Sequence, residues 1–332
     1  MADERRLAID IVVPVYNEEQ VVAEFHRRLR DAVTPLRREH DVRICYVNDG
    51  SVDHTAEELA KLAAGDVDVT IVELSRNFGH QAALTAGLDR AEGDVVVSLD
   101  GDGQHPPELI PDMVALYRAG FDVVLTQRVA ADLPRFKRWT STAFYWLLSL
   151  IGDTRIAAGS ADYRLLSRPV LNALREMREY HRFLRGMVAW VGFRTVVLPY
   201  AEPARLGGRP KYSLTRMVRL AADATFSFSL VPLRIALAVG VGFLGLAAAE
   251  ALYVISFWLT GRQHLLVPGW SSLMFMILIV GAALMIGVGL VGIYVGYIFQ
   301  EVKQRPIYLV RTVERSAGAH PPRAGDDPDR AR

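Results

Sequence analysis

This chain of 332 residues contains a single cysteine, Cys45. One thiol cannot form an intrachain disulfide, and it excludes zinc sites built from several cysteines. The chain also lacks an excess of either charge, because 38 basic and 37 acidic side chains leave a net charge of +1. Without a basic surplus, the composition gives no reason to expect a nucleic-acid partner.

Charged side chains are almost missing from one stretch of 65 residues, Ile235–Phe299, where only Glu250 and Arg262 carry a charge. Two apolar runs within it, Ile235–Leu259 and Ser271–Phe299, each exceed the roughly 20 residues that a helix needs to cross a bilayer. The residues between the runs are too few for more than a turn. We therefore expect two transmembrane helices joined as a hairpin.

The basic residues that flank the two runs predict their orientation. Arginines and lysines precede the first run and follow the second, whereas the hairpin turn offers only Arg262. The positive-inside rule then places both termini in the cytoplasm, and we expect the bacterial inner membrane. Glu250 is interpreted as a packing or oligomer contact, although a carboxylate inside a membrane is also a functional candidate. The spacing of Gly292 and Gly296 is typical of helix packing and favours a homo-oligomer.

The first two hundred residues follow a different pattern, in which short runs of valine, isoleucine and leucine alternate with segments of helical spacing. The runs are Ala8–Pro14, Arg43–Asn48, Val69–Leu74, Asp94–Asp100 and Asp122–Thr126. The helical segments are Glu18–Leu36, Thr55–Ala64, Gln81–Arg90 and Pro107–Arg118. Alternation of strand and helix predicts an α/β fold with a mainly parallel sheet covered on both faces.

Polar residues follow each of the first four predicted strands. They form the strings PVYNE (residues 14–18), NDGS (48–51), SRNFGH (75–80) and DGDGQ (100–104). Taken singly, each string could be a helix cap or an ordinary turn. In a parallel sheet, however, ligands bind beyond the carboxyl ends of the strands, so four such strings together predict a binding site at that edge.

Asp100 and Asp102 have the clearest chemistry of these residues. They directly follow an apolar run that we expect to form a buried strand. A turn after this strand can bring both carboxylates to one point. Carboxylates with few other protein ligands suit Mg²⁺ or Mn²⁺ shared with a substrate diphosphate. The alternative is a solvated Asp-Gly turn without a ligand.

At this point the residues resemble a known family. The strings VVPVYNEE, VNDGS, LSRNFGHQAALTAG and LDGDGQHPPE are similar to the inverting GT-A glycosyltransferases of family 2. Further strings, ADYRLLSRPV, RFLRGMVAWVGF, RLGGRPKYS and SFSLVPLR, resemble the polyprenyl-phosphate branch of that family. That branch includes dolichyl-phosphate mannose synthases and bacterial polyprenyl-phosphate glucosyltransferases. The resemblance covers nearly all of the chain except its tail.

The resemblance implies a GT-A nucleotide-sugar-binding domain and a metal-dependent, inverting transfer of a hexose from a nucleotide-sugar to polyprenyl phosphate at the cytoplasmic membrane face. The two-helix hairpin favours the bacterial glucosyltransferase branch and UDP-glucose as donor. A GDP-mannose-dependent mannose synthase and a non-catalytic protein that binds lipid phosphate are the alternatives. A processive polysaccharide synthase fits less well, because the string RFKRW (residues 135–139) lacks the glutamine of its Gln-x-x-Arg-Trp motif.

The resemblance also implies roles for individual residues. Those expected to bind the nucleotide-sugar are Pro14, Tyr16, Asn17, Glu18, Asp49, Asp100 and Gln104, with Arg128 after the fifth strand as a helper. Asp102, together with Asp100, is expected to hold Mg²⁺ or Mn²⁺. Asp162 matches the position usually assigned as catalytic base, and Asp102 shares the catalytic role through the metal. Arg205 and Lys211 match the basic residues that receive the lipid phosphate. Arg209 and Tyr212 lie beside them just before the first apolar run, so we expect them to bind the same phosphate.

The acceptor changes what a base at Asp162 must do. A phosphate monoester has a second pKa of about 6, so it is largely dianionic at neutral pH and needs positioning more than deprotonation. We therefore expect Asp162 to act through orientation and local field as much as through proton removal.

These expectations divide the chain into four parts. The first two are a cytoplasmic GT-A catalytic domain (1–204) and an amphipathic juxtamembrane segment (205–234). The third is the pair of transmembrane helices at 235–259 and 271–299, and the fourth is a cytoplasmic C-terminal segment (300–332). From Thr312 onward that segment is rich in proline, glycine, alanine and mixed charge, which predicts a disordered tail.

Overall fold

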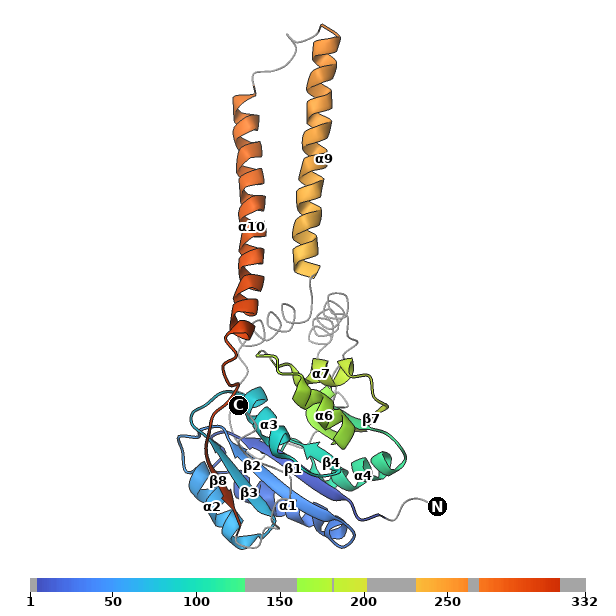
Figure 1. Ribbon diagram of the computed structural model, residues 1–332, viewed down its shortest axis with the longest axis vertical. Helices are drawn as coiled ribbons and strands as arrows, with labels where there is room; N and C mark the ends of the chain where they lie inside the picture. The colour runs from blue at the N-terminus through green and yellow to red at the C-terminus, as the bar shows by residue number, and fades with distance from the viewer. Residues whose placement is uncertain (1–4, 129–159, 181, 202–230, 262–268, 317–332) are drawn as a thin grey trace. The chain divides into compact units, whose positions relative to one another are not determined.

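The computed structural model describes residues 5–128, 160–180, 182–201, 231–261 and 269–316. These residues fall into two compact units (Figure 1). One unit holds a β-sheet with its helices and takes in the chain again from residue 306 onward, and the other holds two long helices.

The first unit is built on an eight-stranded sheet with the order β7-β5-β6-β4-β1-β2-β3-β8. The strands are β1 (Ala8–Val15), β2 (Asp41–Asn48), β3 (Val69–Leu74), β4 (Val95–Ser98), β5 (Val123–Arg128), β6 (Ser160–Ser167), β7 (Thr195–Tyr200) and β8 (Val310–Arg315). Strands β4, β1, β2 and β3 are parallel, as are β5 and β7. Strand β6 is antiparallel to both β4 and β5, and β8 is antiparallel to β3. The mainly parallel sheet of the prediction is confirmed.

The helices of this unit are α1 (Val22–Arg37), α2 (Thr55–Gly65), α3 (His80–Arg90), the 3₁₀ turn η1 (Pro107–Leu109), α4 (Ile110–Arg118), α6 (Arg168–Glu176) and α7 (Leu184–Trp190). All four predicted helical segments are present, but the first begins at Val22 rather than Glu18. Before Val22 the chain forms a turn, in which the Glu18 carbonyl accepts the Val21 and Val22 amides at 3.0 and 2.9 Å. The amides of Asn17 and Glu18 donate to the hydroxyls of Ser51 and Thr55.

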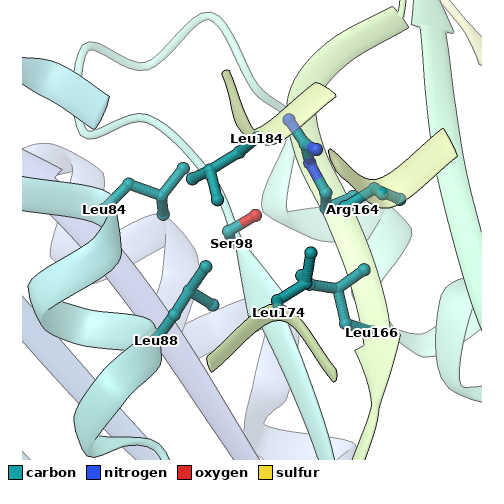
Figure 2. Close-up of a pocket in the computed structure, with 8 residues that line it drawn as sticks. Leu84, Leu88, Ser98, Arg164, Leu166, Leu174 and Leu184 are labelled. Atoms are coloured by element: carbon teal, nitrogen blue, oxygen red, sulfur yellow. The ribbon is translucent and has the colours of Figure 1, made fainter. Parts of the chain in front are cut away.

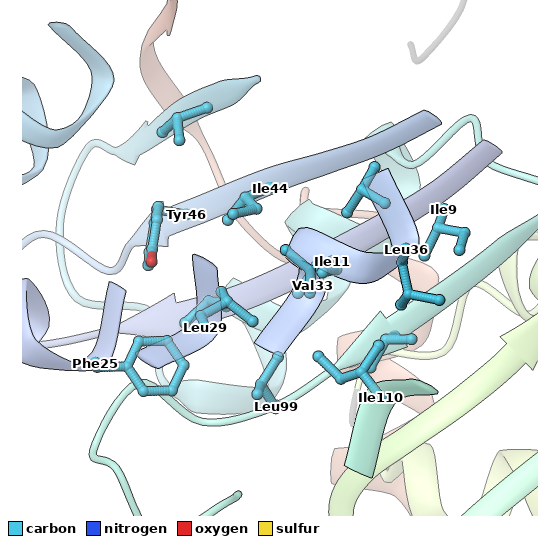
Figure 3. Packing of buried hydrophobic residues seen from close by; sticks show 14 of the residues in the cluster. Ile9, Ile11, Phe25, Leu29, Val33, Leu36, Ile44, Tyr46, Leu99 and Ile110 are labelled. Carbon is cyan, nitrogen blue, oxygen red and sulfur yellow. The ribbon is translucent and has the colours of Figure 1, made fainter. Parts of the chain in front are cut away.

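Helices α1 and α3 pack on opposite faces of the central strands (Figure 1). Helix α1 presents an apolar stripe that includes Phe25, Leu29 and Val33, one helical turn apart, and Figure 3 shows it against Ile9 and Ile11 of β1. Burial of each such side chain stabilises the fold by about 1.5–3 kcal/mol. On the other face, a Cβ on Gly87 of α3 would lie 2.2 Å from Val12 Cγ1, so this close approach of α3 to β1 requires glycine.

Strand β8 corrects the prediction for the C-terminal tail. Residues Thr312–Arg315, predicted to begin a disordered segment, pair with β3 instead, and the ladder ends where the Ser316 amide donates to the Val69 carbonyl at 3.2 Å. The prediction of disorder relied on polar composition. Most side chains of this edge strand are indeed charged or polar, but because they are solvent-exposed they are compatible with a strand. Such residues are common on strands that cover an otherwise open sheet edge. Residues 317–332 lie outside the described part of the chain.

The second unit contains α9 (Val231–Leu259) and α10 (Trp270–Val302), which contact each other. Within the described residues, one helix is long and apolar enough to cross a membrane. It is Ile279–Val302, with a mean hydropathy of 2.2 and none of its apolar window buried.

Candidate active site

The loops after β1 and β2 are joined at the carboxyl edge of the sheet, as the sequence predicted. The Asn17 amide donates to Ser51 Oγ at 3.0 Å, and Asn17 Oδ1 accepts from the Val52 amide at 3.0 Å. Asn17 has a φ of +53°, a left-handed conformation that asparagine tolerates better than most residues. Pro14 is buried at the end of β1, and Tyr16 and Glu18 are half-buried in the same loop.

Asp49 holds the next loop in place. Its two carboxylate oxygens accept the backbone amides of Phe78 and Gly79 at 2.8 and 2.9 Å. Burial raises the pKa of this carboxyl, although the two amides oppose the shift. Gly50 follows with a φ of +62°, and a Cβ there would lie 2.4 Å from the backbone carbon of Arg76. Asp49, predicted to contact the nucleotide, therefore also fixes the β3–α3 loop.

The loop after β4 carries Asp100, Asp102 and Gln104. His105 Nδ1 accepts the Asp100 amide at 2.9 Å, so the ring proton lies on Nε2. The His105 ring is buried and stacks on Tyr163 with centroids 5.3 Å apart, and this burial lowers the pKa of His105. Asp102 Oδ1 accepts the Gln104 amide at 3.0 Å. The backbone that presents the two carboxylates is thus held by a neutral, packed histidine.

Asp100 and Asp102 have the donor set that a divalent ion requires. Asp100 Oδ1 is buried and, among the described residues, accepts no hydrogen bond. Hard divalent cations take carboxylate oxygens and complete their shell with water or substrate oxygens. The described residues contain no group of three or more His, Cys, Asp or Glu side chains placed to hold a metal. The two aspartates fit an ion whose other ligands come from outside the protein.

A cluster of charges surrounds Asp162 on β6. The carboxylate accepts a hydrogen bond from Arg164 and a bidentate pair from Arg185, with Nε to Oδ1 at 3.0 Å and Nη2 to Oδ2 at 2.9 Å. His80, the first residue of α3, places Nε2 3.5 Å from Asp162 Oδ2 and 3.4 Å from Asp100 Oδ1. His80 therefore links the carboxylate at the end of β4 to the one on β6.

These contacts set the charge states in the cluster. Burial alone would raise the pKa of Asp162, but the hydrogen bond from His80 and the charges of Arg185 and Arg164 outweigh it and hold that pKa well below its usual range. Burial would lower the pKa of His80, but the carboxylates of Asp100 and Asp162 raise it to about 9. Asp162 is therefore ionised, and His80 is a cation at neutral pH.

Arg164 is a buried charge that depends on Asp162. Figure 2 shows its side chain at the edge of a small, largely apolar pocket, beside Ser98 and Leu184. Arg164 Nε is buried without a hydrogen-bond partner among the described residues. A buried guanidinium in such surroundings requires an anion, because isolated charges are costly to remove from water.

Arg128 stands at the exposed end of β5, and its Nε donates to the hydroxyl of Tyr200 at 3.2 Å. The predicted lipid-phosphate residues, Arg205, Arg209, Lys211 and Tyr212, lie outside the described residues. His80, His105 and Arg185 take part in the site although no role was predicted for them. The strings that carry the family resemblance contain all three, but their pairing with Asp100 and Asp162 arises only from the tertiary fold.

Comparison with known proteins places the chain in a family. Residues 10–175 match the family described as Glycosyl transferase family 2. The protein named uncharacterized glycosyltransferase YkcC, from Bacillus subtilis (strain 168), is 37% identical over 308 residues, which cover 92% of this chain and 94% of YkcC. Bactoprenol glucosyl transferase of Shigella phage SfII is 35% identical over 313 residues, 93% of this chain and 99% of that protein.

Solved structures were also compared. The mannosyltransferase PcManGT from Pyrobaculum calidifontis, in complex with GDP-Man and Mn²⁺, aligns with 87% of this chain and 89% of its own, at 20% identity and a TM-score of 0.43. The family match covers half of the chain, and the two relatives align with more than nine tenths of it. This chain belongs to glycosyl transferase family 2 and is a glycosyltransferase with a GT-A-like α/β fold.

Proposed function

We propose that this chain transfers a hexose from a nucleotide-sugar, with UDP-glucose favoured, to polyprenyl phosphate. The observation that carries the proposal is the position of Asp100 and Asp102 at the carboxyl end of β4, beside a cationic cluster that can face phosphate groups. The acceptor and the sugar are supported by relatives named bactoprenol glucosyl transferase, which align with 93% of this chain.

The carboxyl edge of the sheet binds the donor in this proposal. The loop of residues 14–18 and Asp49 receive the nucleotide, while Gln104 and Arg128 lie toward the diphosphate and the sugar. Asp100 and Asp102 would hold a divalent ion, which would stabilise the leaving diphosphate as a Lewis acid. A single displacement at the anomeric carbon by a phosphate oxygen of the acceptor inverts the configuration, and the carbon–oxygen bond to the nucleoside diphosphate breaks as the new bond forms.

Asp162 acts through orientation and field in this reaction. Its pKa lies well below the usual range, so it is a weak proton acceptor. The acceptor phosphate is already largely dianionic at neutral pH and has no need of deprotonation. The requirement is instead to bring two anionic substrates together, which calls for fixed cations.

We propose that the reaction takes place at a membrane surface, and the length of the two apolar helices supports this proposal. Helices α9 and α10 have 29 and 33 residues, about 44 and 50 Å at 1.5 Å per residue. Both lengths exceed the roughly 30 Å of a hydrocarbon core. We propose two spans with both termini and the catalytic domain (1–204) in the cytoplasm. The segment 205–234 lies at the interface, where Arg205, Arg209, Lys211 and Tyr212 receive the lipid phosphate.

The test is nucleoside diphosphate release by the full chain, purified in detergent with Mg²⁺ or Mn²⁺. A panel of UDP- and GDP-sugars is assayed with and without a short polyprenyl phosphate. We expect release from UDP-glucose that depends on the lipid and is lost in Asp102→Asn. Asp31→Asn is the matched control, because this exposed residue pairs with Arg27 away from the site. Lipid-dependent release from GDP-mannose instead overturns the sugar assignment, and lipid-independent release overturns the acceptor.

A further inference from the structure

Strand β6 contributes side chains to both faces of the sheet beside the site. Asp162 contacts His80 of α3, and Arg164 lines the small pocket on the same face. Successive strand residues point to opposite faces, and Tyr163 accordingly belongs to the hydrophobic core on the other face, together with Ile110 of α4. The Tyr163 side chain is fully buried. It therefore contacts a different part of the site from its two neighbours.

The part that Tyr163 contacts is the loop of residues 100–106, which carries Asp100 and Asp102. The Tyr163 hydroxyl donates to the Pro106 carbonyl at 2.8 Å. Its ring stacks on the ring of His105, with centroids 5.3 Å apart and planes inclined by 25°. His105 in turn accepts the backbone amide of Asp100 at 2.9 Å through Nδ1. Tyr163 thus holds the end of the loop directly and the beginning of the loop through His105.

We propose that Tyr163 is a positioning residue for the divalent ion. It acts through Pro106 and His105 to keep Asp100 and Asp102 in the conformation that binds the ion, and it touches neither the ion nor the substrates. The inference rests on the proposed function, in which the two aspartates hold Mg²⁺ or Mn²⁺. It deepens that function by naming the residue outside the loop on which metal binding depends.

The backbone that carries Tyr163 is fixed on both sides. Ser98 Oγ on β4 donates to the Asp162 carbonyl at 2.8 Å, and Thr126 Oγ1 on β5 donates to the Tyr163 carbonyl at 2.8 Å. The ring is supported as well, since the ring of Tyr200 on β7 packs edge-on against it, with centroids 6.3 Å apart and planes at 78°. Groups held by strands and by packed neighbours keep their position more precisely than groups on loops. Tyr163 is therefore a rigid anchor.

The loop itself consists of tight turns that need such an anchor. Gly103 has a φ of +79°, and a Cβ on Gly101 would lie 2.7 Å from Val15 Cγ1. Asp102 lies between these two glycines, which allow the backbone more conformations than other residues do. A loop without anchors would lose this freedom when the ion binds, at a cost in entropy. Because the anchored loop is already ordered, loss of the anchor should appear as weaker metal binding.

The experiment measures how Mn²⁺ strengthens the binding of UDP, so it needs no turnover. UDP is titrated calorimetrically into the full chain in detergent, first in EDTA and then at a series of Mn²⁺ concentrations. Tyr163→Phe keeps the stacked ring and loses the hydrogen bond to Pro106. His105→Phe keeps a ring against Tyr163 and loses the acceptor for the Asp100 amide.

Tyr46→Phe is the matched control. Tyr46 is also fully buried, and its hydroxyl lies 3.0 Å from His26 Nδ1, in a contact that joins β2 to α1 rather than to the loop of residues 100–106. The thermal midpoint of each variant is recorded. The control then separates the general effect of removing a buried hydroxyl from an effect on the metal.

We expect Tyr163→Phe and His105→Phe to bind UDP in EDTA within twofold of the unaltered chain. The Mn²⁺ concentration at which UDP binding is half enhanced should rise about tenfold in both, a common loss when a group that supports a metal ligand is removed. In the transfer reaction, kcat of Tyr163→Phe should recover at saturating Mn²⁺, because Tyr163 does not touch the substrates. Tyr46→Phe should lower the thermal midpoint without changing the Mn²⁺ dependence.

The inference is overturned if both loop variants show the Mn²⁺ dependence of the unaltered chain within twofold, or if Tyr46→Phe shifts it equally. It is also overturned if Mn²⁺ leaves the UDP affinity of the unaltered chain unchanged. If any of these results accompanies lipid-dependent transfer by the unaltered chain, transfer to the lipid stands without the inference. If the unaltered chain transfers no sugar to the lipid, but Tyr163→Phe shifts the Mn²⁺ dependence tenfold and Tyr46→Phe does not, the inference stands and the proposed transfer fails.

Discussion

The backbone amide of Ser75 donates a hydrogen bond of 2.8 Å to the carbonyl oxygen of Leu309. Arg311 extends this contact, with Nη2 donating to the Ser75 carbonyl at 2.9 Å and Nη1 to Glu73 Oε1 at 3.1 Å. Ser75 begins the loop that carries His80. The chain after the apolar helices therefore contacts the same loop that Asp49 holds through the amides of Phe78 and Gly79.

Removal of strand β8 should loosen this loop. A chain that ends at Pro306 loses five paired residues along β3 and the support of Ser75. Each net hydrogen bond contributes about 0.5–1.5 kcal/mol, so loss of this ladder should lower the free energy of unfolding by several kcal/mol. UDP should also bind less tightly.

A chain that ends at Ser316 keeps β8 and is the control. Equal thermal midpoints and equal UDP affinities for the two truncations would show that β8 does not support the site.

Substitution of Asp162 should affect stability as well as turnover. Asp162→Asn leaves the buried charge of Arg164 without its anion, and breaking a buried ion pair from one side costs about 3–5 kcal/mol. Because the surroundings of Arg164 are largely apolar, Asp162→Asn combined with Arg164→Met should recover much of the lost thermal stability. Activity should not recover, since Arg185 and His80 stay unanchored. Recovery of activity in the double variant would mean that Asp162 serves only to neutralise Arg164.

Removal of divalent metal should abolish nucleoside diphosphate release. With EDTA-treated protein, we expect activity to return on addition of Mn²⁺ or Mg²⁺. Asp102→Asn should stay inactive even at ten times the metal concentration that gives the unaltered chain half-maximal activity, because one of two carboxylate ligands is lost. Asp31→Asn should titrate like the unaltered chain. Full activity in EDTA would argue that Asp100 and Asp102 bind the donor without a metal.

Acid should destabilise the fold through His26. The ring is buried on α1, with Nδ1 3.0 Å from Tyr46 Oη, and this burial lowers the pKa of His26 below its ordinary 6.5. As pH falls below about 6.5, the unfolded chain takes up this proton before the folded chain does, so stability is lost. The thermal midpoint should drop less between pH 7.5 and 5.5 in His26→Gln. The exposed control His54→Gln should follow the unaltered chain, and an identical drop in all three proteins would contradict the assignment.

Most of the central sheet could be predicted from the sequence, because β1 to β5 are short apolar runs separated by amphipathic helices. Strand β6 was not predicted. Its sequence, SADYRLLS, places Asp162 and Arg164 inside a buried strand, where charges interrupt the apolar pattern. These charges are tolerated because Asp162 pairs with both Arg164 and Arg185. Arg185 lies on α7, and no local sequence pattern reveals a pairing between separate elements.

The meeting of the loops of Asn17, Asp49 and Asp100 at one sheet edge could also be predicted, since parallel neighbouring strands bring them together. The position of His80 between the carboxylates of Asp100 and Asp162 could not be predicted. It depends on where α3 begins, after a loop whose backbone amides bind Asp49. Likewise, the low pKa of Asp162 depends on Arg185, 23 residues further along the chain. The family resemblance predicts a role for Asp162, and the fold shows which side chains hold its carboxylate.

The measurement that tests the account most directly is the formation of a lipid-linked sugar. The full chain, in detergent with Mn²⁺, is given UDP-glucose and a short polyprenyl phosphate, and the lipid fraction is analysed by mass spectrometry. We predict a polyprenyl-phosphate hexose that forms together with an equal amount of UDP and is missing with Asp102→Asn. A lipid fraction that remains unmodified across UDP- and GDP-sugars, with correctly folded protein, would contradict the account.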